Sequence, residues 1–133
     1  MRLYKLTDEN GRTWGGMQWG ENVTHSATGP EGQPLCSNGW IHFYESPEMA
    51  AFMNPIHADF KNPQLWEAEG EIGIRDGVLK CGCRTGTTIR KIALPEITTT
   101  QRVEIAIRCA LSVSNEPGFV AWAGKWISGE DRT

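Results

Sequence analysis

The pattern of apolar and polar positions divides the chain into strand-like alternation and, toward its C-terminal end, helical spacing. The clearest alternation runs over 65–74, where apolar or small side chains alternate with acids. The acids are Glu67, Glu69 and Glu71. This pattern predicts an antiparallel strand with a solvated acidic face. A cation site, or an acidic surface that attracts a basic partner, is the alternative interpretation.

Turn residues delimit the other predicted strands. A first strand over 2–7 ends at the reverse-turn sequence Asp8-Glu9-Asn10-Gly11. Residues 12–14 return, Gly15-Gly16 interrupts the ladder, and 17–25 is again extended before a Gly- and Pro-rich loop over 26–34. Predicted turns at Arg75-Asp76-Gly77 and Thr85-Gly86 separate strands over 65–74, 78–84 and 87–94, which form a meander.

Helix signals follow the strands. Ser46-Pro47-Glu48 predicts a short helix that Asn54-Pro55 ends. Thr98 and Gln101 form a capping-box pattern, and helical apolar spacing continues to 113. A further short amphipathic helix is expected over 119–127. The predicted class is α+β: a mainly antiparallel sheet with a meander, packed by one long C-terminal helix and two short helices, in a single globular domain over 1–133.

Composition narrows the function classes. The chain has 133 residues and a net charge of −3, and it lacks a basic run, which disfavours nucleic acid as a partner. No apolar run approaches the roughly 20 residues of a membrane span, and the N-terminus lacks a signal peptide's apolar region. Four cysteines without an export signal indicate reduced thiols in a cytoplasm. The end at Thr133 fits a natural terminus or a truncation.

The densest group of functional side chains lies in 36–52. After the turn Ser37-Asn38-Gly39, the aromatic and β-branched residues 40–44 predict a strand. Alternation places Trp40, His42 and Tyr44 on one face. Either this is simply the polar face of a strand, or His42, Tyr44 and the neighbouring Glu45 meet a ligand in a cleft.

Three kinds of chemistry can be compared with the residues present. Zinc would use Cys36, His42, Cys81 and Cys83, but their spacing matches no zinc motif, so no metal is predicted. A nucleophile at Cys36 or Ser37 beside His42 lacks a protease or esterase signature. Dinucleotide and Walker motifs are absent. The Gly- and Thr-rich segment after Cys81 carries Arg84 and is either a phosphate-binding turn or a tight hairpin; with Arg90 and Lys91 it makes a small basic group.

Several segments resemble small uncharacterised proteins of bacteriophages and prophages. They are Arg2-Leu3-Tyr4-Lys5, the pattern Leu35-Cys36-x-x-Gly39-Trp40-Ile41-His42-x-Tyr44-x-x-Pro47, and Trp66-Glu67-x-Glu69-Gly70. The resemblance covers most of the chain and implies no established activity. It does imply a protein that acts in the cytoplasm of the host cell.

A weaker resemblance is to small domains with a Gly-Phe-Ile-His-x-Ser signature and an ADP-ribosyltransferase-like fold, although Trp40 and Tyr44 replace the Phe and the Ser. This resemblance implies a nicotinamide-nucleotide cleft. Its catalytic residues would be His42, Tyr44 and an acid, for which we take Glu69 among the three acids of that strand. The expected ligand-binding residues are Trp40, Glu45, Arg84 and Arg90. No resident cofactor is predicted.

Three hypotheses follow. The first is a phage-type accessory protein that acts as a binding module for a host or viral macromolecule, with a protein as the expected partner; aromatic residues are enriched at such contacts, and the chain has six Trp. The second is an enzyme or binder of a nicotinamide nucleotide. The third is a structural or assembly protein that uses the helix over 119–127 as an oligomer contact. The sequence leaves the oligomeric state open.

Overall fold

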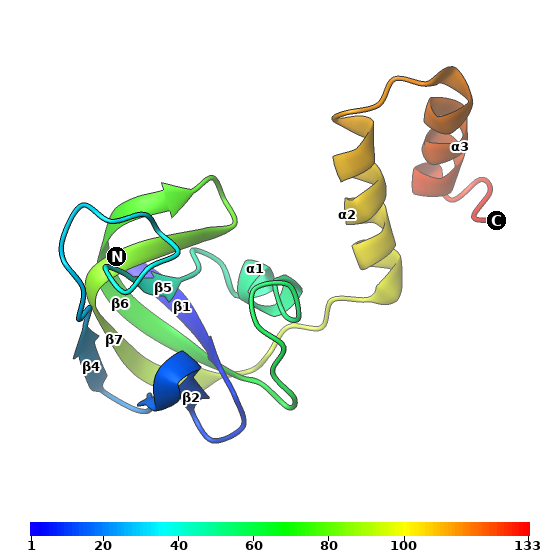
Figure 1. The fold of residues 1–133 in the computed structure, drawn as a ribbon. Helices are drawn as coiled ribbons and strands as arrows, with labels where there is room; N and C mark the ends of the chain where they lie inside the picture. Colours follow the sequence, from blue (N-terminus) through cyan, green and yellow to red (C-terminus); the bar gives the residue numbers. More distant parts are fainter. The chain divides into compact units, whose positions relative to one another are not determined.

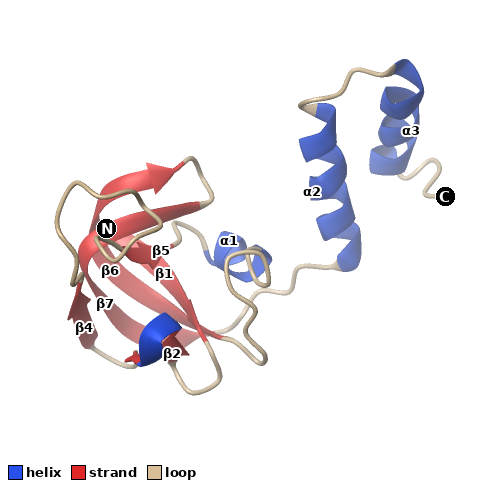
Figure 2. Ribbon diagram, viewed as in Figure 1, coloured by secondary structure: helices blue, strands red, loops and turns tan.

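The computed structural model covers residues 1–133, which form two compact units: Met1–Glu96, here called the strand unit, and Ile97–Thr133, the helical unit. The strand unit contains the sheets and one α-helix, and the helical unit contains two α-helices (Figure 1, Figure 2). The predicted α+β class with a mainly antiparallel sheet is confirmed. A single domain over 1–133, and the packing of the long helix on the sheet, stay predictions.

The main sheet is built around one long hairpin. Its strands β6 (Gln64–Asp76) and β7 (Lys80–Ile92) have 13 residues each and turn at Gly77, whose φ is +52°. Strand β1 (Arg2–Thr7) pairs with β6, while β4 (Val23–Ser26) and β5 (Ile41–Phe43) pair with β7. All of these pairs are antiparallel.

Strand β5 also connects back to β1. Tyr4 and Tyr44 exchange two backbone hydrogen bonds of 2.8 Å each. Since β1 pairs with β6, β6 with β7 and β7 with β5, this bridge closes four strands into a ring. Irregularities along the β6–β7 pair, between Glu67 and Ile74, supply the extra local twist that bulges give to a sheet.

The turn predicted at Thr85-Gly86 is wrong, because β7 runs through these residues without a break. Gly86 has a packing role instead: a Cβ at this position would collide with the ring of Phe43. Glycine in a strand marks either a turn or a close approach, and the sequence does not distinguish the two. The segment predicted as two short strands is therefore one long strand that can pair with three others.

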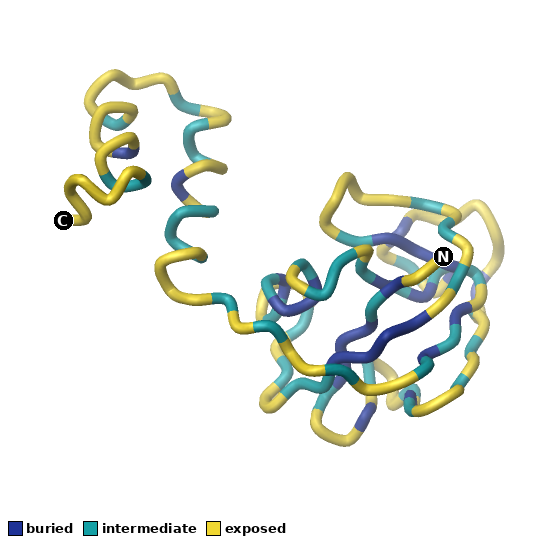
Figure 3. The backbone as a smooth tube through the Cα atoms, turned by 180° about the vertical axis from the view of Figure 1, so that it is seen from behind, coloured by how far each residue is buried: buried dark blue, intermediate teal, exposed yellow.

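Alternate side chains of β5 point to opposite faces of the sheet, so only every second one is buried in the core. Ile41 and Phe43 lie in the core, and His42 lies half-buried on the other face, as predicted. Figure 3 shows the buried positions concentrated in the strands. The main cluster consists of Leu3, Trp19, Ile41, Phe43, Ala68, Cys81 and Cys83. A second cluster, of Leu6, Ala50 and Leu65, joins α1 (Pro47–Phe52) to β1 and β6.

Local signals explain the short elements. Ser46 caps α1 by accepting a 3.1 Å hydrogen bond from the Met49 amide, and Pro47 occupies the first helical position, as predicted. The Gly15-Gly16 break is a 3₁₀ turn, η1 (Trp14–Gly16), with φ near +77° at both glycines. It joins β2 (Arg12–Thr13) to β3 (Met17–Gln18), which form a separate two-stranded sheet.

The helical unit matches its sequence signals. Helix α2 (Thr99–Leu111) begins with the predicted capping box between Thr98 and Gln101. Helix α3 (Pro117–Ser128) ends at Gly129, whose φ of 83° suits a residue without a Cβ. No helix of the chain is long and apolar enough to cross a membrane.

The packing of Phe43 against β7 can be tested with Gly86→Ala. We expect the added methyl group to lower the free energy of unfolding by about 1–3 kcal/mol, because a well-packed core has no room for it. Urea denaturation of the purified chain measures the change. The matched control is Gly20→Ala, where a Cβ would meet only Val23 at an ordinary 3.5 Å. Equal stability of the two variants would contradict this packing role for Gly86.

Candidate ligand cleft

The strand unit contains a cleft of about 910 Å³. Its walls come from β1, β5, the turn around Trp14, the loop before β5, and the segment 53–60 after α1. Such a volume is typical of sites for small organic ligands. The cleft brings together Trp40, His42 and Tyr44, which alternation had placed on one strand face.

His42 is held by the loop before β5. Its Nε2 lies 2.5 Å from the carbonyl oxygen of Leu35, and since a carbonyl only accepts, Nε2 carries the proton. The neutral ring therefore presents Nδ1 as an acceptor. Burial lowers the pKa of His42 below its ordinary value, more than the Leu35 hydrogen bond raises it. Above neutral pH the cleft thus holds an uncharged imidazole.

Tyr44 pairs with a histidine that the sequence analysis did not single out. The Tyr44 hydroxyl lies 2.8 Å from Nδ1 of His57, and the two rings are stacked with centroids 5.9 Å apart. Burial raises the pKa of Tyr44 to about 12, so the hydroxyl keeps its proton at neutral pH. Burial likewise lowers the pKa of His57. No motif connects these two residues, since the chain between them includes all of α1.

Lys5 is the second residue that sequence reasoning missed. It lies on the inward face of β1 with Leu3 and Thr7, and only 8% of it is exposed. Its ammonium donates a 2.6 Å hydrogen bond to the carbonyl oxygen of His42 and lies over the rings of Trp19 and Phe43. It makes no ion pair. Burial lowers the pKa of Lys5 to about 7. The sequence did contain a signal for this burial: strand alternation places Lys5 on the same inward face as Leu3 and Thr7, which lie two positions away on each side.

Two tryptophans line the cleft in different ways. Trp40 is fixed, because its Nε1 donates a 2.7 Å hydrogen bond to the Gln33 carbonyl and its ring lies against Gly73. Trp14 is 96% exposed and sits on the 3₁₀ turn. An exposed tryptophan such as Trp14 is a common feature of binding surfaces. Two further lining residues meet each other, because the exposed thiol of Cys36 lies 3.4 Å from the Lys80 ammonium.

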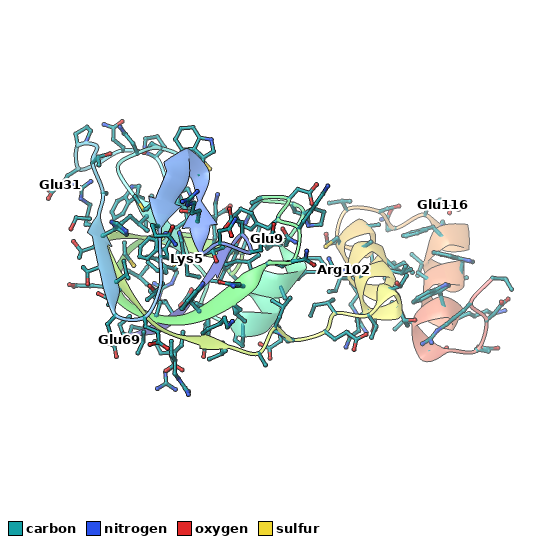
Figure 4. The ribbon with its side chains drawn as sticks, turned by 90° about the horizontal axis from the view of Figure 1, so that it is seen from below. Lys5, Glu9, Glu31, Glu69, Arg102 and Glu116 are labelled. Atoms are coloured by element: carbon teal, nitrogen blue, oxygen red, sulfur yellow. The ribbon has the colours of Figure 1, made fainter.

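The predicted acid Glu69 lies elsewhere. It is exposed and lines a shallower depression with Glu71 and Arg75, and none of the three predicted acids, Glu67, Glu69 and Glu71, lines the cleft. Figure 4 labels Glu69 and Lys5 on separate parts of the strand unit. Glu67 departs from the predicted solvated face: it is buried between Arg2 and Arg90, with ion-pair distances of 3.0 and 2.9 Å.

The other predicted ligand-binding residues have structural partners. Arg90 holds Glu67, and Glu45 forms an ion pair with Arg75 at 3.1 Å. Arg84 donates to three loop carbonyls, those of Gly29, Pro30 and Gly39, at 2.9, 3.3 and 2.6 Å. Arg84 thus fixes the loop that carries one wall of the cleft. No group of three or more His, Cys, Asp or Glu side chains is placed to hold a metal ion.

The role of Arg84 leads to a test by hydrogen exchange. In Arg84→Ala, three carbonyls lose a charged donor, so the loop should open more often. We expect exchange of the Gly29 amide, which donates to Asn38, to accelerate by about tenfold or more. Arg12→Ala, which removes an exposed arginine outside the loop, should leave that rate unchanged. An unchanged rate in Arg84→Ala would show that the loop is held by other contacts.

Burial of Lys5 predicts a pH dependence of stability. Between about pH 7 and the ordinary pKa of 10.5, the unfolded chain binds a proton at Lys5 that the folded chain does not. The free energy of unfolding therefore gains a positive slope, at most about 1.4 kcal/mol per pH unit. Urea denaturation at pH 7, 8 and 9 should show this slope in the wild type and in Lys61→Met. In Lys5→Met the slope should be smaller by that amount; parallel curves for all three proteins would contradict the burial of Lys5.

Comparison with protein-family models, curated proteins and solved structures finds no match to this chain. Both resemblances, to phage and prophage proteins and to ADP-ribosyltransferase-like domains, therefore stay hypotheses. The geometry of the cleft is what remains to indicate a function.

Proposed function

We propose that the strand unit is a binding module and that the cleft is its ligand site. The observation that supports this most directly is the convergence of aromatic and polar side chains in one concave space of about 910 Å³. Trp40 and Tyr44 offer ring surfaces, while His42 and Lys5 offer hydrogen-bonding groups among apolar walls. Ligand sites have this composition: mostly apolar, with a few placed polar groups.

Binding fits this geometry better than group transfer does. The weaker resemblance requires an acid beside His42 and Tyr44, yet Glu67, Glu69 and Glu71 are all absent from the lining of the cleft. Asp59 is the one carboxylate there. The aromatic rings and the size of the cleft still support the hypothesis that the chain binds a nicotinamide nucleotide. A transferase that uses Glu69 has no geometric support.

A macromolecular partner is the second candidate, and Trp14 favours it. A tryptophan that is 96% exposed on a double-glycine turn can insert into a pocket of another protein. We accordingly retain the proposal of a phage-type accessory protein that engages a host or viral macromolecule in the host cytoplasm. Replacement of Trp14 would weaken the binding of such a partner, but Trp14 also lines the cleft, so a variant of another lining residue is needed to test the cleft by itself.

A fragment screen by NMR tests the binding module. We expect small aromatic fragments to shift the backbone resonances of His42, Tyr44 and their neighbours. In Ala58→Trp the new ring should occupy part of the cleft and weaken these shifts, because Ala58 is one of its lining residues. The matched control Ile56→Trp changes an exposed residue of the same segment outside the lining. A screen in which no fragment shifts a cleft resonance would refute the proposal.

A further inference from the structure

The ammonium of Lys5 lacks the charge partner that a buried cation normally has. Lys5 is 8% exposed and lines the cleft, and its nitrogen contacts one carbonyl and two aromatic rings rather than a carboxylate. Burying an unpaired charge is costly, so lysines in such places are usually paired or neutral. In this chain, the lysine without a charge partner is one of the residues that line a ligand-sized space.

The charges around the cleft set the charge of the ligand that fits. Three charged side chains line it, Lys5, Lys80 and Asp59, and they sum to one positive charge when Lys5 is protonated. The histidines His42 and His57 are neutral above neutral pH, because burial lowers the pKa of each. One negative charge on a ligand would therefore balance the cleft.

The aromatic rings of the cleft indicate the shape of the uncharged part of the ligand. Trp40 is locked by its hydrogen bond to Gln33, and Tyr44 is locked by its contact with His57. Rigid aromatic surfaces favour a planar group, since stacking against them costs little conformational entropy. The fit is thus to a flat ring joined to a single anionic group.

We propose that the cleft binds a small aromatic carboxylate, whose carboxylate pairs with the ammonium of Lys5 while its ring lies against Trp40 and Tyr44. This inference rests on the proposed function and specifies the chemical class of its ligand. No covalent step is involved.

Binding of this kind takes up a proton. The free Lys5 amine has a pKa of about 7, and a carboxylate beside it raises that pKa, so above pH 7 the ligand binds together with a proton. The groups that face Lys5 from other strands are Cys81 and Cys83 on β7 and His42 on β5. Burial raises the pKa of Cys81 to about 12 and raises that of Cys83, and it lowers that of His42. Lys5 is therefore the group of this set that titrates between pH 7 and pH 8.5.

Calorimetry with three probes that share one ring tests the proposal on the full chain. Indole-3-acetate is the carboxylate, indole-3-acetamide its neutral isostere, and tryptamine its cationic counterpart. At pH 7 we expect the carboxylate to bind about tenfold or more tightly than the amide, and tryptamine to bind least. At pH 8 the carboxylate should take up close to one proton, measured in buffers of different ionisation enthalpy. From pH 7.5 to pH 8.5 its affinity should fall by about tenfold.

Lys5→Met supplies the decisive variant, because methionine is close to lysine in length and suits apolar surroundings. It should bind the carboxylate no better than the amide, with no proton uptake. Lys61→Met, at an exposed position outside the lining, should behave like the wild type. Urea denaturation of both variants establishes that they are folded.

The outcomes separate this inference from the proposed function. If the amide or the amine binds in the cleft as tightly as the carboxylate, the cleft is a ligand site but the charge assignment is wrong. The charge assignment is equally wrong if the carboxylate binds without proton uptake, or if Lys5→Met keeps its preference. If no probe binds and the fragment screen also leaves the cleft unperturbed, both proposals fail.

Discussion

The pair of backbone hydrogen bonds between Tyr4 and Tyr44 holds the functional part of this molecule together. Strand β5 has three residues, too few to be stable alone, and it is secured by β7 on one side and by this bridge to β1 on the other. Closure brings the backbone of His42 within 2.6 Å of the Lys5 ammonium. Closure of the ring of strands thus places the Lys5 ammonium beside the backbone of His42, at the inner end of the cleft.

The outer wall of the cleft depends on a different interaction. The loop between β4 and β5 contains few regular backbone pairs, and the Arg84 guanidinium organises it by binding three of its carbonyls. An arginine that satisfies backbone acceptors in this way is a structural cross-link rather than a ligand contact. The loop in turn positions Leu35 and Gln33, whose carbonyls orient the rings of His42 and Trp40. Arg84 therefore affects the cleft indirectly, through the loop that it holds.

Sequence reasoning succeeded where the signal is local and failed where it depends on long-range contacts. The caps at Ser46 and Thr98 were predicted correctly, because a capping side chain and the backbone amide that donates to it lie three positions apart. The turn at Thr85-Gly86 was wrong, because the reason for Gly86 is the ring of Phe43, far away in the chain. Glu67 was expected in solvent, because its two partners, Arg2 in β1 and Arg90 in β7, are distant from it in the sequence and come together only in the fold.

The candidate site shows the same division. Trp40, His42 and Tyr44 are two positions apart, so alternation was enough to group them. His57 and Lys5 joined them only through the path of the chain after α1 and the closure of the ring. Arg90 and Glu45 carried the right chemistry for ligand contacts, but nearby opposite charges engage both.

Ring closure also bears on which strand edges of the sheet stay open. A free strand edge is a template on which another chain can add a strand, and closing a sheet removes such edges. In the strand unit, β1 and β5 are edge strands that cover one another where they meet at Tyr4 and Tyr44. The outer edge of β4 is four residues long, and the end of β6 beyond β1 carries the charges of Glu71 and Arg75. Short and charged edges resist strand addition, so the fold that shapes the cleft also leaves few edges on which another chain could add a strand.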